Sequence, residues 1–180
     1  VQNGLVKFLS TANGRDYGRI LTASTGINAT LTLLTGGTLW FTADAIGSLV
    51  NAPEALPPLL RIYVFTNLAL APFAQSNFVQ QANLKFRGIF LSNFLRGGAF
   101  FGFVAFTWLS GREFVLEQLA WAQFGAASAA SLAALSYAIP YLRFSSRLEF
   151  PRVRQLLRFG LFTFGTSLST MLYRLIDRFM

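Results

Sequence analysis

The sequence contains no cysteine and no histidine among its 180 residues. Without Cys there is no disulfide and no thiolate nucleophile, and without His the common zinc sites and every Ser-His-Asp arrangement are excluded. Charge is also scarce: only 12% of the residues are charged, against roughly 25% in soluble domains. Because few catalytic schemes survive these absences, we expect a protein that is not an enzyme and that holds no metal or other cofactor.

Apolar residues take the place of the missing charge. Hydrophobic residues make up 53% of the chain, Phe alone occurs 20 times, and the mean hydropathy is +0.48. This leaves too little polar surface to coat a globule of this size in water. The composition therefore indicates a lipid environment.

Long runs without charge divide the chain into segments of membrane length. Four runs span at least 23 residues each, one of them broken only by Arg96, and a fifth is shorter: 20–43, 62–84, 88–111, 118–142 and 159–173. A helix needs about 20 apolar residues to cross a ~30 Å hydrocarbon layer, and in lipid it must satisfy its own backbone hydrogen bonds. We predict an all-α fold, a single polytopic bundle with five membrane-spanning helices at 20–43, 58–84, 88–111, 115–142 and 153–180.

The connections between these segments alternate between basic and acidic. Positive charge collects before residue 20, at 84–87 and at 142–158, whereas 44–56 has two acidic residues and no basic one, and 112–117 has one Arg against two Glu. Lys and Arg are enriched in cytoplasmic loops, so we expect 84–87 and 142–158 in the cytoplasm and 44–56 outside. The net charge of +8 is then a topology signal, and we expect no nucleic-acid partner.

Arg96 is the most informative single residue. It lies eight residues beyond Gly88, which is roughly 12 Å into the layer. An arginine near a helix centre costs about 2.5–3.5 kcal/mol on insertion scales, and such a charge faces protein or water. Two interpretations stay open: Arg96 lines a cavity and binds an anion, or it bonds structurally to neighbouring carbonyls.

Three further charged residues are candidates for substrate binding. Arg61 follows Pro57-Pro58 at the outer end of the second segment, where it either binds substrate or snorkels to the head groups. Arg174 and Asp177 lie three residues apart in the last segment, so they can pair on one helix face. Either the pair contacts substrate or it neutralises itself.

Amides and small residues mark two helix faces. Asn77 and Gln80 share one face of the second segment, where they either line a wet cavity, suited to sugar hydroxyls, or hold helices together. The row Ala122–Ala138 repeats alanine at every fourth position, which is typical of a helix-packing surface. We expect this row to contact other helices.

Three stretches resemble one family of transporters. They are NGLVKFLSTANGRDYGRI, FAQSNFVQQANLKFRGIFLSNFLRGG and LLRFGLFTFGTSLSTMLYRLIDRFM. They are similar to the second-to-third connection, the fourth-to-fifth connection and the seventh helix of polysaccharide or O-antigen flippases. This family belongs to the multidrug/oligosaccharidyl-lipid/polysaccharide exporter superfamily. Because the chain starts at Val1 without an initiator Met and ends inside an apolar segment, we expect it to be an internal part, helices three to seven, of a protein with about 12 to 14 helices.

The resemblance implies two helical lobes around a cavity that opens alternately to each side of the cytoplasmic (inner) membrane. The implied cargo is a polyprenyl-diphosphate-linked oligosaccharide for surface polysaccharides such as the O-antigen of lipopolysaccharide. The partners we expect are therefore this lipid-linked cargo, membrane lipid and the remaining helices of the same full-length chain. The guanidinium group of arginine can donate two parallel hydrogen bonds to the diphosphate. Arg96 is therefore the first candidate for binding it, and Arg61 the second.

Three other functions stay open. A drug or cation antiporter of the same superfamily needs cavity carboxylates, and the acidic residue considered for that role, Asp177, lies near the end of the last predicted helix. A membrane-embedded glycosyl- or acyltransferase needs paired carboxylates or a His. A structural membrane protein without transport activity needs none of these features.

Overall fold

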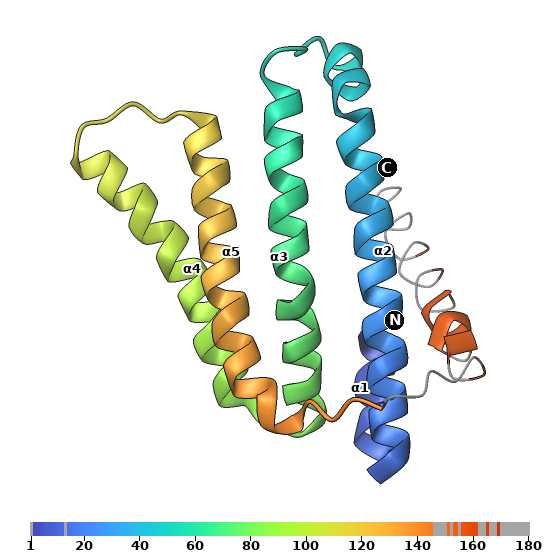
Figure 1. The fold of residues 1–180 in the computed structure, drawn as a ribbon. Coiled ribbons are helices and arrows are strands. Elements are labelled where there is room, and N and C mark those ends of the chain that lie inside the picture. Colours follow the sequence, from blue (N-terminus) through green and yellow to red (C-terminus); the bar gives the residue numbers. More distant parts are fainter. Residues whose placement is uncertain are drawn as a thin grey trace. The chain divides into compact units, whose positions relative to one another are not determined.

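The computed structural model describes residues 2–12, 14–145, 151, 153–154, 156–161, 165 and 169. These residues form helices and connections, without a strand among them (Figure 1). The helices, in chain order, are α1 (Gln2–Thr11), α2 (Gly14–Leu49), α3 (Leu56–Ala82), α4 (Phe86–Leu109), α5 (Leu116–Ala138) and the 3-10 turn η1 (Ile139–Tyr141). The predicted all-α fold class is confirmed for this part of the chain.

The chain divides into two compact units, and the division falls inside α2. One unit is residues 28–141, which hold the second half of α2 together with α3, α4, α5 and η1. The other unit is residues 1–27 and 142–180. The candidate residues Arg61, Asn77, Gln80 and Arg96 all belong to the first of these units.

Three described helices are long and apolar enough to cross a membrane: α3, α4, and the 116–141 helix formed by α5 with η1. Both α3 and α4 begin and end two residues earlier than predicted. Pro57 stands at the second helical position, and Pro is tolerated in a first helical turn, so α3 starts before Pro57. Leu84 adopts a left-handed φ of 55°, which makes the turn tight enough for α4 to start at Phe86.

Helix α2 is 36 residues long and extends beyond the predicted 20–43 at both ends. It is not among the three candidate spans, since its many Thr, Ser and Gly residues lower its hydropathy. Several hydroxyls donate to a carbonyl one turn earlier: Thr22 to Gly18 at 2.9 Å, Thr35 to Leu31 at 2.8 Å and Thr42 to Thr38 at 2.8 Å. Such bonds satisfy the hydroxyl within its own helix.

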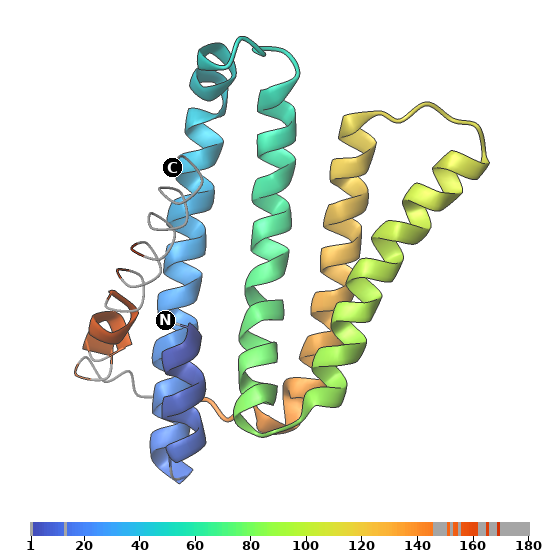
Figure 2. The same ribbon diagram turned by 180° about the vertical axis from the view of Figure 1, so that it is seen from behind.

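Within residues 28–141, α5 packs against both α3 and α4. Its alanine row forms the contact surface, with Ala126, Ala130, Ala134 and Ala138 all buried. Phe73 of α3 packs on Ala130 and Ala134. From this contact, α4 and α5 diverge toward the 110–115 connection in both views (Figures 1 and 2). Small residues let helix backbones approach closely, and the predicted packing role of the row is confirmed.

Candidate functional site

Arg96 occupies the middle of α4. It lies ten residues after Phe86 and 13 before Leu109, so its Cα is roughly 15 Å from the start of the helix. No other charged residue lies between Gly88 and Gly111. If α4 crosses the bilayer, this guanidinium stands near the centre of the hydrocarbon layer.

The Arg96 side chain is partly buried and is directed toward α3. Its Cζ lies 5.3 Å from the centroid of the Phe73 ring, and Phe73 is itself buried. Among the described residues, no hydrogen bond or salt bridge reaches the guanidinium. A ring face attracts a cation but occupies none of the five N–H donors of arginine. The charge is thus held in place while its hydrogen-bonding capacity stays available.

The surface of α4 beside Arg96 is bare. A Cβ added at Gly97, Gly98 or Gly102 would meet no atom of the described residues within 4 Å. A glycine patch lets another helix or a ligand come close to the backbone. Arg96 is therefore bordered on its own helix by open space.

The amides of α3 contact the neighbouring helices. Gln80 is 1% exposed, and its Nε2 donates to the carbonyl oxygen of Ala134 on α5 at 3.0 Å. The Asn77 Oδ1 accepts a long hydrogen bond of 3.4 Å from the Ser92 hydroxyl on α4. Of the two interpretations that the sequence left open, these bonds favour the one in which the amides hold helices together.

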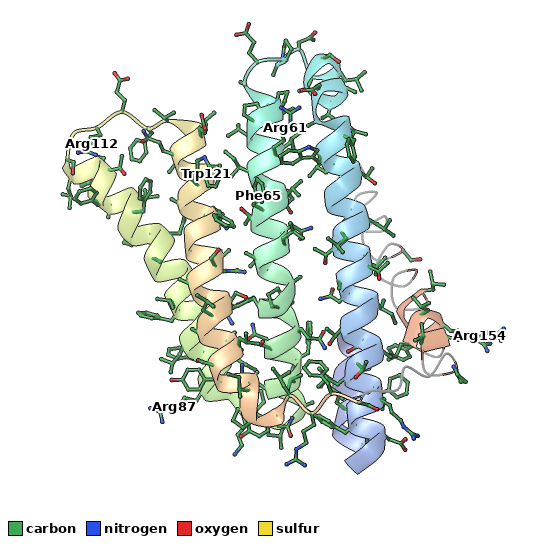
Figure 3. All side chains as sticks on the ribbon, viewed as in Figure 1. Arg61, Phe65, Arg87, Arg112, Trp121 and Arg154 are labelled. Atoms are coloured by element: carbon green, nitrogen blue, oxygen red, sulfur yellow. The ribbon has the colours of Figure 1, made fainter. Side chains whose placement is uncertain are left out.

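Arg61 has protein partners at the other end of α3. Its Nη2 lies 2.7 Å from the Asp44 Oδ2 on α2, and its Cζ lies 5.7 Å from the Trp40 ring centroid. Trp40 meets Phe65 edge-on, and Phe65 stacks on Trp121 of α5 at 6.4 Å (Figure 3). This aromatic cluster joins α2, α3 and α5 at the end that we predict to face outside.

The candidates thus separate by position. Asn77 and Gln80 bond to α4 and α5, Arg96 contacts Phe73 of α3 further along α4, and Arg61 stands at the outer end. Arg174 and Asp177 lie outside the described residues. No group of three His, Cys, Asp or Glu residues placed to hold a metal occurs in the described part of the chain.

The sequence reasoning missed the partners of both arginines, Phe73 and Asp44. Asp44 had a signal: it ends the uncharged run on one side of the 44–56 connection while Arg61 follows on the other, and antiparallel neighbours bring such residues together. No sequence signal pointed to Phe73, because α3 and α4 are rich in apolar side chains that could equally well lie beside Arg96.

Apolar helices of membrane length, connections of alternating charge and a mid-helix arginine define a polytopic α-helical membrane protein. The profile of a family described as polysaccharide biosynthesis protein matches residues 2–180. The chain therefore belongs to this family of polysaccharide biosynthesis proteins, and the resemblance found in the sequence is confirmed. Searches of curated proteins and of solved structures gave no significant match.

Proposed function

We propose that the protein flips a polyprenyl-diphosphate-linked oligosaccharide from the cytoplasmic to the outer leaflet of the inner (cytoplasmic) membrane by alternating access. The product supplies a surface polysaccharide such as the O-antigen of lipopolysaccharide. The protein acts as a transporter without chemical catalysis, together with the remaining helices of its full-length chain. The observation that carries the proposal is the mid-helix guanidinium of Arg96, which has a ring contact but no carboxylate among the described residues.

The chemistry of the cargo fits this charge. A diphosphate crossing the membrane loses hydration in a low-dielectric layer, where an isolated charge is costly. A guanidinium fork offers two parallel N–H donors to phosphate oxygens and so offsets part of that cost. A bound anion in turn lowers the cost of keeping Arg96 at the centre of the layer. The two charges therefore stabilise each other only while cargo is present.

The acidic residues argue against a cation as cargo. Within α3, α4 and α5 the only acidic residue is Glu117, in the first turn of α5. A cation antiporter needs a carboxylate inside the bundle, and the charged residue in the middle of these helices is an arginine, Arg96, instead. This distribution supports an anionic cargo.

The test is flipping by the full-length protein in liposomes. A polyprenyl-diphosphate oligosaccharide with a fluorescent glycan is placed in one leaflet, and its arrival in the other is followed with a membrane-impermeant quencher. We expect Arg96→Ala to slow flipping by about tenfold or more, since a charge-assisted hydrogen bond contributes about 1.5–3 kcal/mol. The flipping rate of Arg96→Lys should lie between those of the wild type and Arg96→Ala, because lysine keeps the charge but lacks the two parallel N–H donors of arginine.

Arg87→Ala is the matched control, since it removes the same side chain from an exposed position at the start of α4. It should flip cargo at nearly the wild-type rate. Normal flipping by Arg96→Ala in correctly inserted protein would make Arg96 structural and remove the main support for an anionic cargo.

A further inference from the structure

The aromatic cluster of Trp40, Phe65 and Trp121 is only partly covered by the rest of the described chain. The three residues are 37%, 40% and 46% exposed. Phe124 of α5 supports them, since its ring meets Phe65 edge-on at 6.3 Å and Trp121 edge-on at 5.7 Å. Arg61, Phe65 and Trp121 lie toward the same end of α3 and α5 (Figure 3). A surface of contacting rings from three helices is therefore exposed at this end.

A polar pair borders these rings. The Arg61 Cζ lies 5.7 Å from the Trp40 ring centroid, and the Arg61 Nη2 donates to the Asp44 Oδ2 at 2.7 Å. The Asp44 side chain is 69% exposed, and within the described residues its Oδ1 accepts no hydrogen bond. Arg61 thus holds a carboxylate beside the rings and leaves one of its oxygens as an acceptor for a ligand.

The combination of rings and polar pair selects the kind of ligand. The guanidinium and the carboxylate cancel in charge, so a phosphate attracted by one is repelled by the other. A neutral hydroxyl instead donates a charge-assisted hydrogen bond to the carboxylate. A pyranose ring has an apolar C–H face that lies flat on an aromatic ring, while its hydroxyls extend from the rim. Small-molecule sites combine aromatic walls with a few placed polar groups in this way.

We propose that the aromatic cluster binds the glycan of the cargo by its sugar rings at the outer surface of the membrane. The ring centroids of the cluster follow one another at 5.7 and 6.4 Å, so the surface is longer than one sugar ring and suits an oligosaccharide. Recognition by the ring face requires no particular glycan. The proposal rests on the proposed function, since the glycan reaches this surface with its lipid still in the membrane.

Exposed rings at a membrane surface also anchor helices among lipid head groups. Trp108 has the features of such an anchor: it is 71% exposed near the end of α4 and makes no ring contact among the described residues. The cluster differs from Trp108, because its rings contact one another and border a carboxylate. Trp108 therefore supplies the matched control for Trp121.

The experiment measures the Kd of two probes for the purified full-length protein in phosphatidylcholine nanodiscs by native mass spectrometry. One probe is a polyprenyl diphosphate, and the other is the same lipid carrying chitotriose, a trimer of N-acetylglucosamine. We expect chitotriose to lower the Kd of the lipid several-fold. Trp121→Leu should raise the Kd of the glycan probe by about three- to tenfold, the range of a single aromatic contact. The Kd of the polyprenyl diphosphate should stay unchanged, which also shows that the variant is folded.

Two further variants separate sugar binding from lipid anchoring. Trp121→Phe keeps an aromatic face and should retain most of the affinity for the glycan probe. Trp108→Leu makes the same substitution at an exposed tryptophan outside the cluster and should leave both Kd values unchanged.

The proposal is overturned if chitotriose adds no affinity, or if Trp121→Leu leaves the Kd of the glycan probe unchanged. It is also overturned if Trp121→Leu and Trp108→Leu weaken both probes alike, because Trp121 would then be a lipid anchor. These outcomes are separable from those at Arg96. Normal flipping by Arg96→Ala does not alter the difference in Kd between the two probes, and loss of glycan binding at the cluster leaves the test of Arg96 unaffected.

Discussion

The guanidinium of Arg96 on α4 rests on the ring of Phe73 on α3, 5.3 Å from its centroid. Phe73 packs in turn on Ala130 and Ala134 of α5, so one ring connects the charge to two further helices. This contact positions the charge without neutralising it, because an aromatic face attracts a cation but occupies none of its N–H donors. A carboxylate in the same place would hold the guanidinium in a salt bridge and make it unavailable to an anion.

The Arg96–Phe73 contact should be measurable as a coupling between the two residues. We expect a double-mutant cycle of Arg96→Met and Phe73→Leu to give a coupling free energy of about 0.5–2 kcal/mol, the range of cation–π contacts. Phe73→Leu also loses packing against α5, but this loss occurs with and without Arg96 and cancels in the cycle. The measurement is the free energy of unfolding of the full-length protein in mixed micelles. Additive single effects would mean that the ring does not hold Arg96.

Gly88 should be intolerant of any side chain. A Cβ at Gly88 would overlap the Gln80 Oε1 and stand 2.7 Å from the Tyr137 Cβ, so α4 would have to move away from α3 and α5. We expect Gly88→Ala to lower the free energy of unfolding by about 1–3 kcal/mol, as overpacking of a tight interface does. Reversible unfolding in micelles measures this loss.

Gly97→Ala is the control for Gly88→Ala, since it places the same methyl group on the same helix where it meets no described atom within 4 Å. It should be neutral or slightly stabilising, because alanine has the higher helix propensity. Equal destabilisation by the two variants would show that helix backbone freedom, and not the contact with Gln80, decides the result.

The helices were predictable because lipid restricts the choice of structure. The predicted helices 58–84 and 88–111 located α3 and α4 to within two residues, and the shift came from local chemistry at Pro57 and Leu84. The full length of α2 was not predictable in this way, because an uncharged run marks the hydrocarbon layer and not the helix. Asp16, Arg19 and Asp44 are compatible with a helix that continues beyond the layer, and α2 includes all three.

The roles within the candidate site were harder to predict, because they depend on long-range partners. An amide suits a wet cavity and a helix interface equally well, and only the Ala134 carbonyl, 54 residues away, gives Gln80 its bond. The sequence located Arg96 because a charge within an apolar run is conspicuous. The sequence could not identify Phe73 as the partner of Arg96, since aromatic and aliphatic side chains are equally compatible with the apolar pattern of α3.

The orientation in the membrane should be testable with single cysteines, because these 180 residues contain none. In a full-length protein freed of other cysteines, Ser48→Cys should react with an impermeant maleimide in intact cells. Lys85→Cys should react only after the membrane is opened, since basic connections stay in the cytoplasm. Both positions are exposed, so burial does not limit the reaction. The reverse pattern would overturn the orientation and the cytoplasmic assignment of the 142–158 connection.

Arg61 should contribute to stability more than to transport, because its guanidinium already has partners in Asp44 and Trp40. The ion pair is 38% and 69% exposed, and exposed pairs contribute only about 0.2–1 kcal/mol. We expect Asp44→Ala to cost at most that amount and Arg61→Ala slightly more, since it also loses the Trp40 contact. Both variants should keep more than half of the wild-type flipping rate, whereas Arg96→Ala should lose most of it. If Arg61→Ala instead stops flipping without loss of stability while Asp44→Ala does not, Arg61 binds substrate, the interpretation that the sequence first suggested.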